Sequence, residues 1–257
     1  MAREMNLNVA LDEFKHGTNI LEVQVPEKLR RRISSGIDWL DFSLGNVGGF
    51  TPSTVTMLTG GSGFGKTTLI LQLADAITAA GHVALFNTGE ECLYQTKMVV
   101  ERLKIKHGFY CGQDVMVKDI LNHARKLSAK NPGKQVFLFQ DSIQACDDGF
   151  YSNGATNGNT PVRCTEMLTA WAKETLGIVV FIGQVNKGGE FAGKNAMKHA
   201  IDVHLHFRID DDKKSETYGE RLLETRKNRF GRSSVTVILG MGSDGLTEKG
   251  RSDFIEA

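Results

Sequence analysis

The chain has little of several features that mark particular classes of protein. Its four cysteines among 257 residues are widely spaced and form no C-x-x-C pair. This spacing argues against a zinc site and against a disulfide framework, and it suits a reducing cytoplasm. No apolar run approaches the roughly 20 residues of a membrane span, and the N-terminus lacks the apolar core of a signal peptide. We therefore expect a cytoplasmic protein that has no membrane partner.

An excess of charge of one sign is also absent. The chain has 31 Lys and Arg against 30 Asp and Glu, which leaves a formal net charge of +1. Any contact with nucleic acid must therefore come from local basic patches and not from the overall charge. The length is enough for one large α/β domain or two small ones, and the sequence shows no internal repeat, coiled-coil pattern or acidic tail.

The strongest positive signal is a glycine-rich run, G-G-S-G-F-G-K-T at 60–67, which fits the phosphate-binding pattern G-x-x-x-x-G-K-[ST]. It follows the apolar run 55–58 and opens a helical pattern, which is the strand–loop–helix context of a P-loop. Glycines allow successive backbone N–H groups to surround phosphate oxygens, and the helix N-terminus adds partial positive charge. We expect Lys66 to reach the β- and γ-phosphates and Thr67 to ligate Mg²⁺. The alternative, a glycine-rich turn before an ordinary helix, does not explain four glycines at this spacing before Lys-Thr-Thr.

Apolar runs alternate with helical patterns along most of the chain. The strand-like runs are 55–58, 83–86, 136–139 and 178–182. The helical patterns are 37–44, 67–80, 91–103, 114–130 and 161–175. This alternation predicts an α/β fold with a mostly parallel central sheet and helices on both faces. Further strand-like runs at 203–209, 221–225 and 235–239 are separated only by turns, and they predict a C-terminal antiparallel hairpin extension of the sheet.

Two segments lack these patterns. Residues 1–33 are a partly polar leader that ends in three arginines, 30–32. We expect either a solvated linker or a contact with a neighbouring subunit or with nucleic acid. Residues 147–160 are rich in Gly, Asn and Ser and predict a flexible surface loop. We assign residues 34–257 to a single domain.

Carboxylates follow two of the predicted strands. Asp141 comes after the strand 136–139, where α/β folds place ligand-contacting groups, and we expect it to hold Mg²⁺ or its water shell. Glu90 and Glu91 come after the strand that begins at 83, and one of them is a candidate to polarise the attacking water of a hydrolase. The alternatives are an aspartate that caps the next turn and a glutamate pair favoured by a helix N-terminus. The predicted nucleotide-binding residues are Gly60, Gly61, Ser62, Gly63, Phe64, Gly65, Lys66, Thr67, Thr68 and Asp141.

Polar and basic residues follow the strand 178–182. Gln184 lies at its tip and is a candidate sensor of a γ-phosphate. The segment 186–199 beyond it contains three glycines and the basic residues Lys187, Lys194 and Lys198. A basic, glycine-rich loop suits the backbone phosphates of a single strand of nucleic acid, and a solvated loop is the alternative.

Lys227 and Arg229 lie in the run K-N-R-F-G, between two candidate strands. Their i, i+2 spacing directs both side chains to the same side of an extended chain. Such cations can stabilise charge on a γ-phosphate, as an arginine finger does, or they can be solvent-exposed charges of a hairpin that has no such role. The spacing leaves both readings open.

These landmarks together resemble the RecA superfamily of P-loop ATPases, and most of all its RadA/Sms branch, over residues 32–248. The runs that carry the resemblance stand in the family's order: R-I-S-S-G-I-D at 32–38, the P-loop, T-G-E-E-C at 88–92, D-S-I-Q at 141–144, G-Q-V-N-K at 183–187 and K-N-R-F-G at 227–231. The last run is unchanged from the family's motif, and the DnaB replicative helicases carry a similar K-x-R-x-G.

The resemblance implies a RecA-like ATPase that uses ATP and Mg²⁺ and acts on single-stranded DNA in recombination, replication or repair. It also implies a homo-oligomer, either a ring, expected to be a hexamer, or a filament, with nucleotide bound between subunits. By the same resemblance, Lys66 neutralises phosphate charge, Glu90 activates water and Gln184 senses the γ-phosphate. Lys227 and Arg229 would reach the nucleotide of a neighbouring subunit.

The resemblance also maps two DNA-facing loops onto the chain. They correspond to residues 147–160 and 186–199, the second of which contains the three lysines named above. RadA/Sms proteins carry an N-terminal four-cysteine zinc module and a C-terminal protease-like domain, and this sequence shows neither. Gln184 replaces the family's histidine and matches RecA and DnaB instead. We therefore expect an ATPase core that stands alone, as would suit a phage or mobile element, with a recombinase or replisome protein as a further partner.

Several functions share these features. A helicase or branch-migration motor and a strand-exchange recombinase both need the same core. A regulatory ATPase of the KaiC type would share that core without acting on DNA. A passive nucleotide-binding adaptor for a larger helicase would bind ATP and hardly turn it over.

Overall fold

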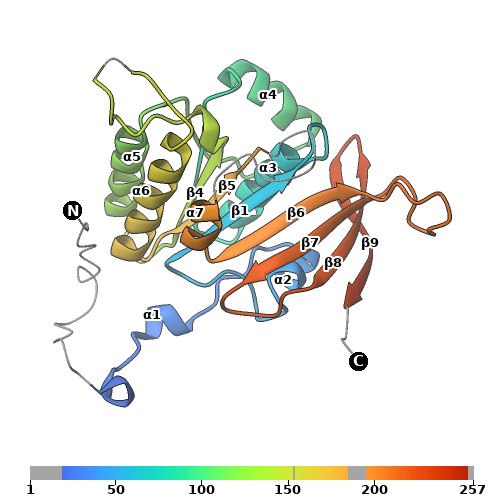
Figure 1. Cartoon of the computed structure of the whole chain (residues 1–257), viewed down its shortest axis with the longest axis horizontal. Coiled ribbons are helices and arrows are strands. Elements are labelled where there is room, and N and C mark those ends of the chain that lie inside the picture. The colour runs from blue at the N-terminus through green and yellow to red at the C-terminus, as the bar shows by residue number, and fades with distance from the viewer. Residues whose placement is uncertain (1–18, 153, 185–194, 254–257) are drawn as a thin grey trace.

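A single mixed β-sheet runs through the molecule. The computed structural model describes residues 19–152, 154–184 and 195–253. Within these ranges the sheet has nine strands in the order β3-β2-β4-β5-β1-β6-β7-β8-β9 (Figure 1). The strands are β1 (Thr54–Gly60), β2 (Val83–Thr88), β3 (Tyr110–Gly112), β4 (Val136–Asp141), β5 (Ile178–Ile182), β6 (Val203–Ile209), β7 (Arg221–Asn228), β8 (Val235–Gly242) and β9 (Gly245–Asp253).

The sheet is parallel from β3 to β6 and antiparallel from β6 to β9. Strands β4 and β5 are buried at every position, which explains their continuous apolar sequences, because helices cover both faces of a parallel sheet. This arrangement confirms the predicted mostly parallel sheet with a C-terminal antiparallel extension. β6 belongs to both parts, since it pairs in parallel with β1 and antiparallel with β7.

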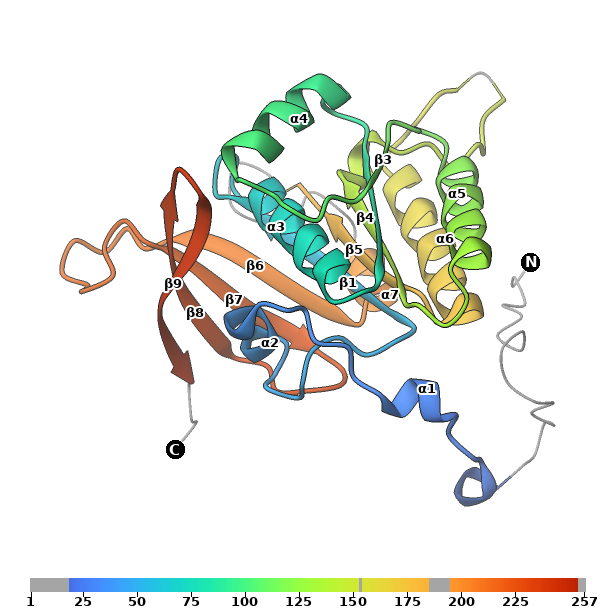
Figure 2. The same cartoon turned by 180° about the vertical axis from the view of Figure 1, so that it is seen from behind.

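Helices cover the two faces of the sheet (Figures 1 and 2). The helical elements are η1 (Ile20–Glu22), α1 (Glu27–Arg30), α2 (Asp38–Ser43), α3 (Lys66–Ala79), α4 (Leu93–Arg102), α5 (Val117–Lys130), η2 (Ile143–Ala145), α6 (Thr160–Thr175) and α7 (Asn195–Ala200). One core unites α2 and α3 with one face of the sheet, through side chains such as Leu73 and Phe139. A second core unites α5, α6 and α7 with the other face, through side chains such as Trp171 and Phe181.

Three segments differ from the sequence prediction. β3 and β9 were not predicted, because β3 is a three-residue edge strand and the sequence of β9, G-L-T-E-K-G-R-S-D, is mostly polar. The end of the predicted loop 186–199 is helical, as α7. The reason is packing: Met197 on this helix and Ile201 just beyond it are fully buried in the second core, one helical turn apart.

The leader joins the body of the protein at residue 33. In the described part of the leader, residues 19–30, no side chain is buried, and α1 lies apart from the sheet in both views (Figures 1 and 2). Ile33 then forms an antiparallel bridge with Phe50, with two N–H···O bonds of 2.9 and 2.8 Å. A domain boundary near residue 33 stays a prediction. No helix in the described ranges is both long and apolar enough to cross a bilayer.

Candidate functional site

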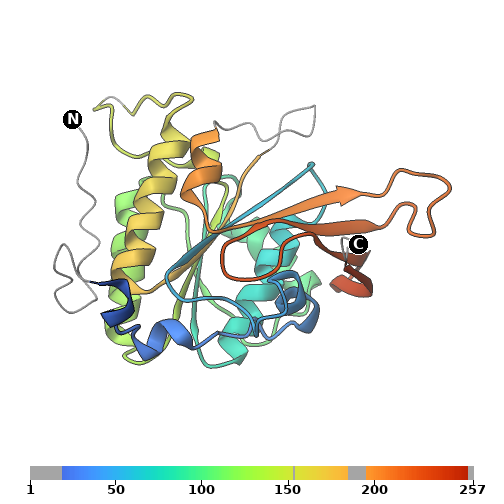
Figure 3. The same cartoon turned by 60° about the horizontal axis from the view of Figure 1, so that its bottom comes forward.

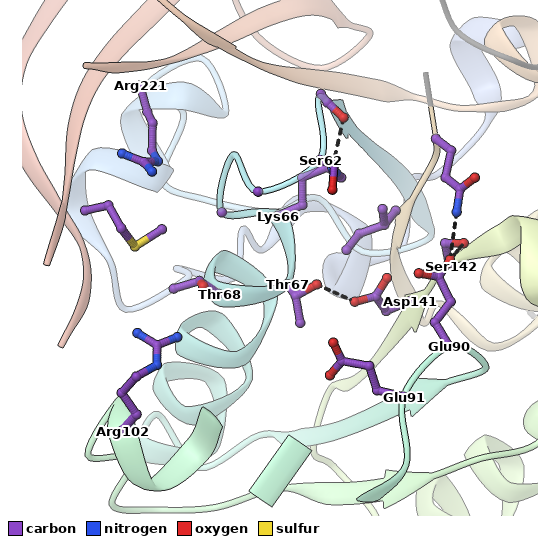
Figure 4. Close-up of a pocket in the computed structure, with 16 residues that line it drawn as sticks. Ser62, Lys66, Thr67, Thr68, Glu90, Glu91, Arg102, Asp141, Ser142 and Arg221 are labelled. Carbon is purple, nitrogen blue, oxygen red and sulfur yellow. Dashed lines mark hydrogen bonds between the residues drawn. The ribbon is translucent and has the colours of Figure 1, made fainter. Parts of the chain in front are cut away.

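A pocket of about 670 Å³ opens where β1, β2, β4 and β5 reach their carboxyl ends (Figure 4). Parallel α/β sheets place their ligand sites at this edge, because the loops that leave the strands converge there. The pocket is lined by Gly60, Ser62, Gly63, Gly65, Lys66, Thr67, Thr68, Glu90, Glu91, Arg102, Asp141, Ser142, Ile182, Gln184, Arg221 and Met241. Eight of the ten predicted nucleotide-binding residues are among them.

The two exceptions in the predicted set are Gly61 and Phe64. The Phe64 ring folds over Gly61, where an added Cβ would lie 2.6 Å from the ring, and it packs against the first core. Gly65 precedes α3 with a φ of +104°, in the left-handed region that glycine adopts without strain. A Cβ at Gly65 would lie 2.7 Å from the terminal methyl of Met241, which would have to shift, so the positive φ is the stronger reason for glycine here.

Lys66 is held inside the glycine loop. Its Nζ donates hydrogen bonds to the carbonyl oxygens of Gly60 (2.9 Å) and Gly61 (2.7 Å). Burial lowers the pKa of Lys66, while the carboxylates of Asp141 and Glu90 act in the opposite direction. The ammonium therefore lies where the N-terminus of α3 already favours an anion.

Thr67 and Asp141 form the second part of the site. The Thr67 hydroxyl donates a 2.6 Å hydrogen bond to Asp141 Oδ2, and Asp141 is 7% exposed. Burial raises the pKa of Asp141 to about 6; the charges of Glu90 and Glu91 add to this, and the Thr67 hydrogen bond opposes it. A hydroxyl and a carboxylate are hard oxygen ligands, and Mg²⁺ takes few protein ligands beside phosphate oxygens and water. The pair therefore fits the predicted metal site.

Glu90 and Gln184 form the third part, opposite the glycine loop. Glu90 Oε1 accepts a 2.9 Å hydrogen bond from Gln184 Nε2 and another from the Ser142 hydroxyl. The backbone N–H of Gln184 donates to Gln144 Oε1 at 3.2 Å, which fixes the tip of β5 against η2. Glu91 also lines the pocket (Figure 4), but of the two glutamates it is Glu90 that accepts the hydrogen bond from Gln184.

Sequence reasoning missed the wall formed by the C-terminal strands. Arg221 begins β7, and it pairs with Ile209 at the end of β6, so it reaches the same sheet edge as the glycine loop. Met241 lies on β8, and Arg102 at the end of α4 donates to the Ser243 carbonyl (3.1 Å) in the β8–β9 turn. No local motif marks these residues. Only the chain topology could have indicated them: the strand that follows β6 runs antiparallel to it, so it must start beside the end of β6.

Lys227 and Arg229 lie at the opposite edge of the sheet. Lys227 pairs with His204 near the start of β6, level with the middle of β1, and neither cation is among the described residues that line the pocket of its own chain. Both contact the end of α7. Their role on a neighbouring subunit's nucleotide stays a prediction, and the structure places both cations away from the pocket beside their own glycine loop.

The residues predicted to contact DNA are only partly described. Lys187 and Lys194 lie outside the described residues, whereas Lys198 is exposed on α7. In the loop 147–160, sequence reasoning missed two exposed aromatic residues, Phe150 (65% exposed) and Tyr151 (37%). The Arg163 guanidinium lies 4.6 Å from the centre of the Phe150 ring.

Comparison with curated proteins finds relatives that share one name. "DNA repair protein RadA" of Mycobacterium tuberculosis (strain H37Rv) is 32% identical over 228 residues, which is 85% of this chain and 44% of the relative. "DNA repair protein RadA" of Haemophilus influenzae is 32% identical over 218 residues, or 84% of this chain and 44% of the relative. The chain thus spans less than half the length of the curated relatives it matches. No protein-family model matches the chain.

Comparison with solved structures tests the fold. A structure described as a DnaB-like replicative helicase has a TM-score of 0.71 at 17% identity, and the match covers 84% of this chain and 61% of the helicase chain. A KaiC-like protein, PH0186 of Pyrococcus horikoshii, has a TM-score of 0.68 at 20% identity, and the match covers 86% and 99%. These likenesses confirm the predicted RecA-like core. The chain is therefore related in sequence to the RadA branch of the RecA superfamily, and its fold is that of a RecA-like P-loop ATPase core.

Proposed function

We propose that the chain is an ATPase core that hydrolyses Mg²⁺-bound ATP and couples hydrolysis to work on single-stranded DNA, in the cytoplasm. One observation carries the first half of this proposal. A phosphate cradle, a hydroxyl–carboxylate pair and a hydrogen-bonded glutamate face the same pocket, at the carboxyl ends of β1, β4 and β2. These are the parts that phosphoryl transfer to water requires.

The phosphates lie along the glycine loop in this proposal. Backbone N–H groups and Lys66 neutralise the β- and γ-phosphate oxygens. Thr67 and Asp141 would hold Mg²⁺, which would supply further positive charge to the phosphates. Met241 offers an apolar surface, and Arg221 and Arg102 offer guanidinium groups, at the side of the pocket where the base and ribose would lie.

Glu90 is the proposed group that positions and polarises the attacking water. The Gln184 side chain donates a hydrogen bond to a carboxylate oxygen of Glu90. A γ-phosphate that attracts the Gln184 amide would break this bond and so change the contacts of Gln184 and Glu90 together. Gln184 directly precedes the segment 185–194. In this proposal Gln184 transmits the state of the nucleotide to that part of the chain.

The site is completed by a second copy of the chain. Lys227 and Arg229 lie at the sheet edge opposite their own pocket, and they belong to the unchanged K-N-R-F-G motif. We propose a ring or filament with nucleotide at each interface. The likeness to the DnaB-like replicative helicase supports the fold of such a core. Particle shape by electron microscopy separates closed rings from filaments.

The proposed DNA contacts are Lys187, Lys194 and Lys198, together with the loop 147–160. Phe150 and Tyr151 add exposed rings on which bases can stack. The shared name of the RadA relatives supports a role in DNA repair. The alternative is a regulatory ATPase of the KaiC type that does not act on DNA; the KaiC-like protein shares the fold of this core.

The test is the ATP hydrolysis rate at low salt with and without single-stranded DNA, with Lys66→Ala as the blank. We expect the rate to rise clearly when DNA is added. A substantial rate that is indifferent to DNA would contradict the proposal and favour the KaiC-like alternative. A rate no higher than that of the blank, together with tight ATP binding, would favour a passive adaptor.

A further inference from the structure

Asp202 is a buried carboxylate to which no part of the proposed mechanism assigns a role. It lies between α7 and β6 and is 1% exposed. Its Oδ1 accepts a hydrogen bond from Arg229 Nη1 (3.1 Å), and its Oδ2 accepts from the Val55 N–H (3.0 Å) and from Lys173 Nζ (3.4 Å). An ionised carboxylate at this depth needs such partners. Asp202 therefore joins the start of β1, helix α6 and the K-N-R-F-G hairpin.

The same hairpin is fastened to the end of α7. Lys227 Nζ donates to the carbonyl oxygens of Lys198 and Ile201, at 2.6 Å each. Arg229 Nη2 donates to the His199 carbonyl (2.9 Å), and the Arg229 N–H donates to the Asp202 carbonyl (3.1 Å). The last carbonyl groups of a helix have no partner within the helix, so these two cations satisfy the end of α7.

Further hydrogen bonds join Asp202 and its partner Lys173 to the start of β1. The Asp202 N–H donates to the Val55 carbonyl (2.9 Å), and Lys173 Nζ also donates to the Ser53 carbonyl (2.7 Å). Helices α6 and α7 pack side by side (Figure 3). Arg229, in contrast, is about half exposed, with its side chain at 48%. The carboxylate is thus fixed, and the guanidinium that it holds borders solvent.

We propose that Asp202 is a positioning residue that holds Arg229 against the end of α7. This inference rests on the proposed function, in which Arg229 acts on the nucleotide of a neighbouring subunit. Asp202 sets the direction from which the guanidinium reaches that nucleotide.

Asp202→Asn tests the assignment, because it keeps the shape of the side chain and removes the charge. We expect kcat to fall by about tenfold or more while KM for ATP changes by less than about twofold, since the subunit's own phosphate cradle is intact. The ATPase activity of mixed assemblies separates this role from a merely structural one, because a subunit that was only destabilised would not show partner-specific recovery. Asp202→Asn subunits should regain activity when mixed with Glu90→Gln subunits and should not regain it when mixed with Arg229→Ala subunits.

Asp210→Asn is the matched control. Asp210 is also a buried carboxylate (6% exposed) and lies at the other end of β6, where it binds the hydroxyl groups of Ser215 and Thr217. We expect Asp210→Asn to leave kcat near the wild-type value. The inference would be overturned if Asp202→Asn had the wild-type kcat. It would also be overturned if Asp202→Asn subunits failed to restore activity to Glu90→Gln subunits while Lys227→Ala subunits restored it. Either result would leave the proposed function unaffected. If Lys227→Ala subunits also fail, the shared site itself is contradicted.

A second measurement covers the case in which Asp202→Asn does not fold. Arg229→Ala changes a half-exposed side chain and leaves Asp202 with its other two partners. We expect amide hydrogen exchange at residues 198–202 to become about tenfold faster in this variant, because α7 loses a partner for its last carbonyl groups. Unchanged exchange at these residues would overturn the inference.

Discussion

Asp141 is a carboxylate whose surroundings favour its neutral form. Its pKa of about 6 reflects burial first, then the negative charges of Glu90 and Glu91. A metal ion must displace the proton before it can bind. We expect the apparent affinity for Mg²⁺ to fall about tenfold for each pH unit below about 6. Isothermal titration of the ATP-bound protein with Mg²⁺ measures this, and an affinity that stays constant between about pH 5 and about pH 6 would contradict the proposed ligand.

Asp141→Asn is the companion variant. The folded state holds the Asp141 proton more tightly than the unfolded chain, so the stability that this group contributes is greatest below the ordinary pKa of 3.8 and is lost as pH rises through about 6. The variant should therefore bind Mg²⁺ weakly at every pH. In the absence of metal it should be more stable than the wild type at about pH 8, by about 1–3 kcal/mol. Thermal unfolding in EDTA checks the sign.

Glu90 and Glu91 are a natural pair for testing which carboxylate acts in hydrolysis. Both line the pocket, and Glu90 alone of the two contacts Gln184. Glu90→Gln should lower kcat by about 10²–10⁴ and leave ATP binding within a few-fold, because a general base acts in the transition state. Glu91→Gln should lower kcat by less than about tenfold. Equal losses in the two variants would remove the special role assigned to Glu90.

The elements of the sheet were predicted to different degrees. The four buried parallel strands and the helices α3 to α6 were predicted from apolar runs and helical spacing, because burial requires such patterns. β3 and β9 carry no such pattern, and they are strands because a neighbouring edge offers hydrogen bonds. α5 begins three residues later than predicted, since the Asp114 backbone is bound by Asn87 on β2 (3.0 and 2.8 Å).

The bridge that joins the leader to the core depends on a glycine. Gly49 has a φ of +105°, and an added Cβ would lie 2.2 Å from the Ile33 carbonyl oxygen, which accepts from Phe50. Gly49→Ala should therefore break the bridge and cost about 3 kcal/mol or more. Gly133→Ala is the control, because Gly133 also has a positive φ (+81°) but no described atom lies within 4 Å of its added Cβ. That variant should cost only about 1–2 kcal/mol. Equal shifts in Tm would show that the bridge contributes little.

At the scale of the whole molecule, the motif residues near the glycine loop were predictable and the opposite wall was not. Lys66, Thr67, Asp141, Glu90 and Gln184 follow parallel strands, whose ends meet at one edge by topology. Arg102, Arg221 and Met241 reach the pocket through the antiparallel extension and the β8–β9 turn. The position of these three side chains at the pocket depends on the register of the antiparallel strands, which no local sequence pattern specifies.

The division of the site between two copies of the chain is tested most directly by mixing subunits. Glu90→Gln subunits keep Lys227 and Arg229, and Lys227→Ala subunits keep Glu90, so a mixed interface contains one complete site. The ATP hydrolysis rate should be near the Lys66→Ala background for each variant alone and should rise to a maximum near an equal mixture. If the mixture assembles to the wild-type size and shows no recovery at any ratio, the site is not shared between subunits.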